Sequence, residues 1–363
     1  VQQAQMQAFV DDVNQRGGIY GRTVELVVAS YDVLDQESGA RAACLRLADD
    51  EQVFAVVNTT GFAPPGTLCL TREKGVPFLQ ASGHPEEVYA QSNGLYSSTF
   101  DNQTRNFRNM VGTLHGLGVL DGQRIGVLGT EWLGFRRQQE DGIVRTLRAL
   151  GYTPEVYWLS GDPVSSQSQI PVALLQLQDN DVIMLGADFL SGQSFVQLGN
   201  AQGFRPRYAA ADPWGYTVDG IAASMGPAFS GAVSVTSMRT YDSRAGLAEP
   251  ELDAQCRQVV VANTELRPDR ANDPNAIYTG SMMACGVIRR FEQAALAAGP
   301  NLTRRGFAAA VAGLGTIAVP FAGGPATYGP QKLDGANHYR AQQWQPNCSC
   351  WQPINNRFTL GEY

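Results

Sequence analysis

The sequence is poor in charge and has no long apolar run. Only 17% of its 363 residues are charged, and no stretch approaches the roughly 18 apolar residues needed to cross a bilayer. The net charge of −7, with no cluster of Lys and Arg, argues against a nucleic-acid partner. The hydrophobic content of 44% is typical of a globular protein, and the length suffices for two lobes with separate cores.

The motifs of common enzymes are also missing. The three histidines, His84, His115 and His338, are far apart, and there is no Gly-x-Ser-x-Gly or Walker-type sequence. No CxxC pair occurs and no histidine lies close to a cysteine, which argues against zinc. The glycines of 116–122 lack dinucleotide-binding spacing and precede a strand pattern instead of following one. We therefore expect no enzyme activity, no metal and no cofactor.

The six cysteines allow two interpretations. Four lie on the apolar faces of helical patterns and two in a polar C-terminal loop. Buried free thiols are common core residues. Alternatively, the chain is exported and forms three disulfides: Cys44–Cys69, Cys256–Cys285 and Cys348–Cys350. Each of the first two would close a loop of about 25–30 residues, worth roughly 3 kcal/mol in the chain-entropy model.

The chain opens with a helical pattern, a glycine turn and an apolar strand pattern. Apolar residues from Met6 to Val13 recur at helical spacing. Gly17 and Gly18 can adopt the left-handed conformation that ends a helix. Residues 24–28 then predict a buried strand. In an α/β chain such a helix should follow a first strand, so we expect that strand to be missing ahead of the helix.

Strand patterns alternate with helical patterns along nearly the whole chain, which predicts parallel sheets with helices on both faces. The predicted strands are 53–57, 76–80, 124–128, 155–159, 182–185, 208–210 and 232–236. The predicted helices are 39–49, 102–117, 136–150, 191–202, 216–224, 249–263 and 275–298. Junctions near 117–123, 237–243 and 320–325 indicate two lobes between which the chain crosses three times.

Six segments resemble a known family in its own order. They are FVDDVNQRGGIYGRTVELVVASYD, RAACLRLADDEQVFAVVNTTG, KGVPFLQASGHPEEV, QRIGVLGTEWLGF, DVIMLGADF and GFRPRYAAADPWG, within a resemblance that runs from Gln5 to about Tyr339. The family is the branched-chain amino-acid type of solute-binding proteins of ABC transporters, which are type I periplasmic binding proteins. The missing first strand departs from the family, because the loop after that strand also faces the ligand there.

The resemblance implies an α/β fold of two doubly wound, Rossmann-like lobes joined by three crossovers. Lobe one would comprise 1–119 plus 240–320, and lobe two 120–239 plus 321–363. Ligand would bind in a cleft between the lobes, where loops at the carboxyl ends of the strands lie, and the lobes would close by a hinge motion.

Localisation and partners follow from the same resemblance. We expect a protein outside the cytoplasm, periplasmic or at the cell surface, with lipid anchoring through a segment not present here as one route. Its partners would be a small solute, most simply an amino acid, and an ABC permease in the membrane, with the binding protein itself a monomer. A ligand-sensing receptor or regulatory domain of the same fold, and a cytosolic α/β enzyme with reduced thiols, are the alternatives.

The first predicted ligand contact in lobe one follows the strand pattern 53–57. Thr59, Thr60 and Gly61 offer hydroxyl groups and backbone N–H groups that suit a carboxylate at a helix N-terminus. The alternative is that the threonines are turn or cap residues.

The second predicted contact in lobe one is the turn after the strand pattern 76–80, where the family binds the ligand's α-carboxylate. By the resemblance, Ser82 and the backbone of Ala81 and Gly83 take this role. Gly83 stands where the family commonly has Thr, which removes one hydroxyl group. His84 either adds positive charge to this turn or is an exposed loop residue.

In lobe two the resemblance points to aromatic residues around the ligand. Trp132 lies one position before the place where the family has a stacking aromatic residue, so we expect Trp132 to stack on the ligand or else to pack within its lobe. Phe189 and Trp214 would form walls of the side-chain pocket, and Tyr216 lines it or packs as core with Trp214.

Two acidic residues of lobe two follow predicted strands. Asp212 matches the acidic residue that pairs with the ligand's ammonium group in amino-acid-binding members, and Asp188 lies at the corresponding end of another strand. A buried carboxylate needs such a partner, because an unpaired buried charge is costly. The alternative for Asp212 is a turn-forming role before Pro213.

Overall fold

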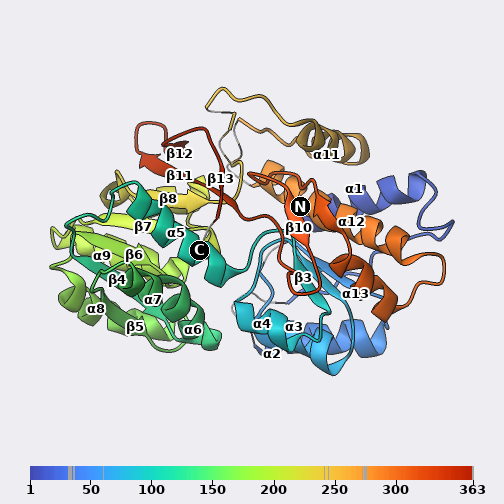
Figure 1. The fold of residues 1–363 in the computed structure, drawn as a ribbon, viewed down its shortest axis with the longest axis horizontal. Helices are drawn as coiled ribbons and strands as arrows, with labels where there is room; N and C mark the ends of the chain where they lie inside the picture. The colour runs from blue at the N-terminus through green and yellow to red at the C-terminus, as the bar shows by residue number, and fades with distance from the viewer. Residues whose placement is uncertain are drawn as a thin grey trace. The chain divides into compact units, whose positions relative to one another are not determined.

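The computed structural model describes residues 1–31, 35, 37–59, 61–240, 242–243, 245–271, 273 and 276–361. The chain divides into two compact units (Figure 1): unit 1, Val1–Asn102 with Leu247–Asn337, and unit 2, Gln103–Gly246 with His338–Tyr363. The chain therefore passes between the units three times, the number of crossovers predicted from the sequence. The lobe boundaries at 119/120, 239/240 and 320/321 stay a prediction.

Unit 1 is built around a small parallel sheet. Its strands β1 (Val56–Asn58), β2 (Phe78–Gln80) and β3 (Tyr96–Ser98) are hydrogen-bonded in that order, and β9 (Gly315–Ile317) and β10 (Ala326–Tyr328) form a separate antiparallel pair. Its helices are α1 (Gln2–Gln15), α2 (Ser38–Leu45), α3 (Pro64–Leu68), α4 (Glu86–Gln91), α11 (Glu251–Asn263), α12 (Ile277–Ala298) and α13 (Arg304–Ala312), with π-helical turns at Arg46–Asp50 and Cys69–Glu73.

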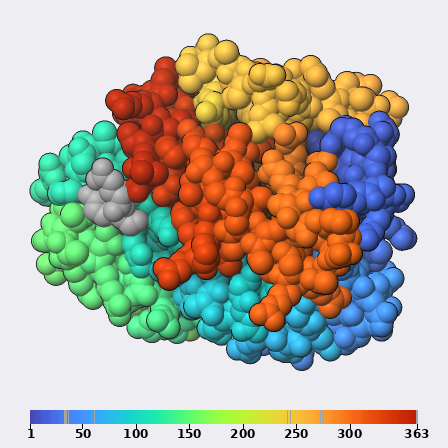
Figure 2. All heavy atoms as spheres, turned by 45° about the vertical axis from the view of Figure 1, so that its right-hand side comes forward, coloured from blue at the N-terminus to red at the C-terminus, as the bar shows by residue number. Residues whose placement is uncertain are grey.

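The two parts of the chain that form unit 1 meet between α1 and α12. Figure 2 shows the blue atoms of the N-terminal segment beside the orange atoms of α12. The buried amide of Gln5 donates to the carbonyl of Ile277 at 2.8 Å and to the hydroxyl of Ser281 at 3.2 Å. Met6, Phe9, Val10 and Val13 are buried, as their helical spacing predicts.

The strand predicted over 24–28 does not form, and that prediction is wrong. Residues 23–31 carry no strand pairing among the described residues, and most of them are half-buried or exposed. The backbone of Val24 is instead held by the side chain of Asn14, which accepts from Val24 N at 2.8 Å and donates to Val24 O at 2.9 Å. A strand exists only where a neighbouring strand takes up its hydrogen bonds, and no described strand does so here.

The disulfide interpretation of the cysteines is confirmed, because all six form disulfides. Cys44–Cys69 joins α2 to the turn after α3, and Cys256–Cys285 joins α11 to α12. Their Cα atoms are 6.2 and 5.8 Å apart. Cys348–Cys350 closes the turn between two strands of unit 2. Every disulfide thus lies within one unit.

Unit 2 contains the larger sheet, whose strand order is β12-β11-β8-β7-β6-β4-β5, with β13 paired to β11. The strands are β4 (Ile125–Thr130), β5 (Glu155–Leu159), β6 (Val182–Leu185), β7 (Arg207–Ala211), β8 (Val233–Thr236), β11 (His338–Gln345), β12 (Cys350–Pro353) and β13 (Thr359–Leu360). The helices are α5 (Gln103–Gly116), α6 (Arg136–Gln139), α7 (Arg145–Ala149), α8 (Ile170–Leu177), α9 (Phe189–Ala201) and α10 (Asp219–Ser224), with a π-helical turn, Glu140–Val144, joining α6 to α7. The stretch 117–123 is a turn between α5 and β4 inside this unit.

Two apolar cores cover the two faces of the unit 2 sheet. Along β6, Val182 and Met184 belong to the core beneath α5, whereas Ile183 and Leu185 belong to the core beneath α8 and α9. This alternation is the period of two expected of a strand covered on both faces. The expected doubly wound arrangement is therefore present in unit 2.

In the part of the chain that the structure describes, no helix is both long and apolar enough to span a membrane.

Candidate ligand-binding loops

The carboxyl ends of β1, β2 and β3 lie at one edge of the unit 1 sheet, since the three strands are parallel. The predicted contacts Thr59 and Ala81–Gly83 follow two of these strands. Thr59 is buried and Gly61 is exposed, while Thr60 lies outside the described residues. The sheet thus places the two predicted turns of lobe one next to each other.

The backbone of Ala81 is already engaged with its neighbours. Its N–H donates to the carbonyl of Asn58 at 2.9 Å, and its carbonyl accepts from the N–H groups of Thr99 at 3.2 Å and Phe100 at 3.0 Å. These bonds fix the turn after β2 against the ends of β1 and β3. Ala81 therefore holds the shape of the turn, and a direct contact from its backbone to a ligand stays a prediction.

Ser82 is half-buried and is positioned by a buried amide. Gln80, the last residue of β2, is 1% exposed, and its Nε2 donates to Ser82 Oγ at 3.2 Å. A hydroxyl group that accepts this bond keeps its own proton for another acceptor. Gln80 Oε1 has no hydrogen-bond partner among the described residues. With the Gln80 amide in this orientation, the Ser82 hydroxyl group can donate to a carboxylate.

Gln80 is in turn held by a buried arginine of α12. Arg290 is 1% exposed, and its Nη2 donates to the carbonyls of Gln80 at 3.0 Å and Ser97 at 3.2 Å. Its Nη1 donates to Tyr328 Oη at 2.9 Å. Neither residue is predicted from the sequence. A polar residue ending the apolar run 76–79 was a usable signal for Gln80, whereas nothing local distinguishes Arg290 within its helix.

Gly83 has no room for a side chain. A Cβ atom there would lie 2.0 Å from the carbonyl oxygen of Asp101 and 2.9 Å from the Cα of Asn102. The Thr that the family commonly carries at this position would therefore clash with the backbone that follows β3. The packing of unit 1 therefore requires glycine at this position, which excludes the hydroxyl group that a Thr would provide.

Both expectations for His84 are wrong. The ring is 3% exposed, its Nε2 is 2.8 Å from Thr67 Oγ1, and it packs 4.9 Å from the ring of Tyr96. Burial lowers the pKa of His84 to about 3, because the charged imidazolium is disfavoured away from water. The side chain is therefore neutral at physiological pH and adds no positive charge to the turn.

In unit 2 the strand order points to a candidate ligand-binding edge. Counted from β4, the parallel strands run 2-1-3-4-5, and in such sheets ligands bind at the carboxyl ends where the order reverses, between the first and third strands. These are β4 and β6. The loop after β4 carries Trp132, and the loop after β6 carries Asp188 and Phe189.

Trp132 and Trp214 stack on each other within unit 2. Their ring centroids are 6.0 Å apart with planes inclined by 20°, and Phe135 meets Trp214 edge-on at 4.8 Å. Trp214 Nε1 donates to the carbonyl of Gly186 at 2.9 Å, which ties the loop after β7 to the loop after β6. Both indoles are half-buried, and Phe189 is 37% exposed. The two tryptophans thus pack against each other within unit 2, and contacts from either ring to a ligand stay predictions.

The backbone around this aromatic group is strained. Leu133 and Trp214 have φ values of 51° and 66°, in the left-handed region, and each is followed by a glycine with positive φ, Gly134 and Gly215. A non-glycine residue in this region costs on the order of 1–3 kcal/mol, and such residues concentrate at binding sites. Two of them in neighbouring loops support a functional role for this edge of the sheet.

Asp212 accepts five hydrogen bonds from neutral groups. Oδ1 accepts from Thr217 Oγ1 at 2.8 Å and Thr236 Oγ1 at 2.6 Å. Oδ2 accepts from Ser237 N at 2.7 Å, Ser237 Oγ at 2.8 Å and Asn106 Nδ2 at 3.3 Å. The carboxylate thereby joins α5 to the ends of β7 and β8. Its predicted pairing with a ligand ammonium group stays untested, and its visible role is structural.

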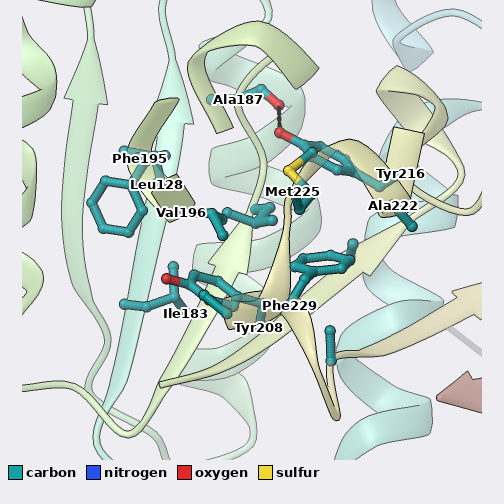
Figure 3. Close-up of a cluster of buried hydrophobic side chains, with 14 of the residues drawn as sticks. Leu128, Ile183, Ala187, Phe195, Val196, Tyr208, Tyr216, Ala222, Met225 and Phe229 are labelled. Carbon is teal, nitrogen blue, oxygen red and sulfur yellow. Dashed lines mark hydrogen bonds between the residues drawn. The ribbon is translucent and has the colours of Figure 1, made fainter. Parts of the chain in front are cut away.

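Asp188 caps a helix, and Tyr216 belongs to the core. Asp188 accepts from Ser191 N at 3.0 Å and Ser191 Oγ at 2.7 Å at the start of α9, and burial raises its pKa. Tyr216 is fully buried, and its hydroxyl group contacts the carbonyl of Ala187 at 2.9 Å (Figure 3). Tyr216 therefore holds the loop after β6 in place through its hydroxyl group. Of the two roles expected for Tyr216, packing in the core is the correct one.

Comparison with known proteins identifies the family. A family model described as periplasmic binding protein matches residues 2–348, and the chain belongs to that family. It is a solute-binding protein of ABC transporters and not an enzyme, and the family is located outside the cytoplasm. The family resemblance inferred from the sequence is confirmed.

Solved structures share the type I fold. They include a leucine-binding protein from Thermotoga maritima MSB8 (15% identity, TM-score 0.74, covering 97% of this chain and 93% of that one). A solute-binding protein from R. palustris in complex with 4-hydroxybenzoate has 12% identity and TM-score 0.74, covering 99% and 93%. A fatty acid substrate-binding protein from Thermomonospora curvata has 19% identity and TM-score 0.71, covering 99% and 87%. No curated protein sequence matches the chain.

Proposed function

We propose that this protein captures a small organic acid outside the cytoplasm and delivers it to an ABC permease. The carboxylate of the solute binds at the turn after β2 in unit 1, and the aromatic group of unit 2 is a separate candidate surface for apolar groups. The observation that carries this proposal is the donor arrangement at Ser82, whose oxygen accepts from Gln80 Nε2 at 3.2 Å and whose proton is left for an acceptor on the ligand.

The ligands of the structural neighbours support a class of solutes as broad as the small organic acids. The three neighbours described above bind leucine, 4-hydroxybenzoate and fatty acids, which are all carboxylic acids of different size and polarity. The amino-acid ligand expected from the sequence is one member of this class and would require an acceptor for its ammonium group. Closure of two lobes around the solute and a monomeric state stay predictions, which ligand-dependent small-angle scattering would measure.

Titration calorimetry against a panel of amino acids, hydroxybenzoates and fatty acids tests the proposal. A hydrogen bond to a charged group contributes about 1.5–3 kcal/mol, so Ser82→Ala should weaken binding of the best acid at least tenfold. Ser168→Ala, an exposed serine on the surface of unit 2, is the matched control and should bind like the parent. An unchanged Kd for Ser82→Ala, or a best ligand with no acidic group, would contradict the proposal.

A further inference from the structure

The carboxylate of Asp212 has no capacity left for a ligand. A carboxylate offers about four lone-pair positions, and five donors already surround this one, at 2.6–3.3 Å. The donors come from Asn106, Thr217, Thr236 and Ser237, so they are fixed by α5, by β8 and by the segment before α10. A ligand ammonium group would have to displace one of them.

The other acidic residues on the same loops are also engaged. Asp188 is 4% exposed and both its oxygens accept hydrogen bonds from Ser191. Glu131 forms an ion pair with Arg136. An ammonium group placed against these loops would therefore compete with contacts that these carboxylates already make within the fold, and burying a charge without a partner is strongly unfavourable.

The aromatic group at the same edge favours a different kind of ligand body. Trp132 and Trp214 present stacked, half-buried indoles, and Phe189 is exposed beside the loop that Trp214 Nε1 binds. Partly exposed aromatic rings in a fixed orientation bind flat or apolar groups, with ring contacts adding to the burial of apolar area.

We propose that the solute is a carboxylic acid with an aromatic or apolar body and without an ammonium group. This inference rests on the proposed function and narrows its substrate class. Unit 2 presents aromatic surface at this edge, and the carboxylates of Asp188 and Asp212 there already serve the fold.

Matched ligand pairs test the inference by calorimetry on the full chain. 3-Phenylpropanoate and L-phenylalanine differ only in the ammonium group, as do 4-methylpentanoate and L-leucine. The acid without an ammonium group should bind at least tenfold more tightly in each pair, or about 1.4 kcal/mol. Equal or tighter binding of the amino acids would overturn the inference and leave the proposed function standing. If neither these acids nor any member of the wider acid panel binds, the proposed function itself fails.

Substitutions in unit 2 test whether its aromatic residues cause the preference for acids without an ammonium group. Trp132→Ala should weaken binding of 3-phenylpropanoate at least fivefold, whereas Phe204→Ala, an aromatic residue before β7 that packs on the core beneath α8 and α9, should not. Equal effects would overturn the aromatic assignment.

The role of Asp212 is tested through the ratio of the affinities for the two ligands, because a purely structural change would alter both affinities alike. Asp212→Asn should leave the affinity ratio of 3-phenylpropanoate to L-phenylalanine within threefold of the parent, and a tenfold rise in that ratio would show that Asp212 binds the ammonium group and overturn the inference. Should this variant fail to fold, Ser237→Ala removes one of the five donors and still leaves four for about four lone-pair positions, so it should leave the affinity ratio within threefold of the parent. A tenfold rise in the relative affinity for L-phenylalanine would show that Asp212 accepts the ammonium group and overturn the inference.

Discussion

Unit 1 and unit 2 present different chemistry at the carboxyl ends of their parallel strands. In unit 1 the turn after β2 is polar and tightly packed, with Ser82 aligned by Gln80 and with no space for a side chain at Gly83. In unit 2 the corresponding edge is aromatic, and its carboxylates serve the fold. The difference is chemical: the unit 1 turn offers hydrogen-bond donors, whereas the unit 2 edge offers aromatic rings.

The two units also differ in what stabilises them. The strands β1, β2 and β3 have three residues each, and unit 1 adds two disulfides and the buried Arg290. Unit 2 has a large sheet with an apolar core on each face and a single local disulfide. Because all five tryptophans belong to unit 2, tryptophan fluorescence reports on that unit alone.

The largest effect should follow removal of a unit 1 disulfide. In the chain-entropy model the Cys44→Ala/Cys69→Ala variant loses about 3.5 kcal/mol of unfolding free energy, against about 1.6 kcal/mol for Cys348→Ala/Cys350→Ala with its much shorter loop. Urea unfolding followed by circular dichroism measures the whole chain, and fluorescence measures unit 2. The first variant should shift the dichroism transition to lower urea and leave fluorescence nearly unchanged. A larger loss of unfolding free energy from the Cys348→Ala/Cys350→Ala variant would contradict the expected difference between the two units.

The next effect concerns acid stability of unit 1. Since the folded-state pKa of His84 is lowered from 6.5 to about 3, its contribution to stability is complete above pH 6.5 and is lost as pH falls from 6.5 toward 3. At pH 4.5 the loss amounts to about 2.7 kcal/mol, two pH units at 1.36 kcal/mol each. His84→Gln should therefore lose less stability than the parent between pH 7 and 4.5. His115→Gln, on α5 of unit 2, is the control, and parallel pH profiles for the parent and His84→Gln would contradict the assignment.

The smallest expected losses of stability come from alanine substitutions at two glycines, one in each unit. Gly83→Ala places a methyl group 2.0 Å from a backbone oxygen, so the turn must move, and we expect a loss of about 2 kcal/mol together with weaker solute binding. Gly134→Ala meets open space but has a φ of 78°, and should cost about 1 kcal/mol. Thermal unfolding and calorimetry on both variants measure this. A smaller loss for Gly83→Ala than for Gly134→Ala would show that the unit 1 turn is not tightly packed.

Much of the fold could be predicted from local sequence. The strands Glu155–Leu159 and Val182–Leu185 form as predicted, because compact runs of apolar, aromatic and β-branched residues are a direct signal for strands. The segment 24–28 has the same apolar pattern but forms no strand with the described residues. A strand also needs a neighbouring strand to pair with, and its own residues do not encode that partner. The helix predicted from Tyr216 begins only at Asp219, because Tyr216 is drawn into the core.

The site was less predictable than the fold. Ser82 and Trp132 were found through the family pattern, and both lie at strand ends. Their partners Gln80 and Trp214 act through contacts that sequence spacing does not reveal. Asp212 shows the limit most clearly, because its donors include Asn106 and Ser237, 106 and 25 residues away in the chain. An acidic residue that binds a ligand and one that binds its own fold look the same in sequence.

The disulfides have a consequence for how the chain matures. Unit 1 is assembled from residues 1–102 and 247–337, yet Cys44–Cys69 lies wholly in the first segment and Cys256–Cys285 wholly in the second. Each cysteine has its partner 25, 29 or 2 positions away. Oxidation can therefore be completed segment by segment as the chain emerges, before the two distant segments dock through α1 and α12. Correct pairing needs no long-range search, so formation of these bonds does not have to wait for the rest of the protein.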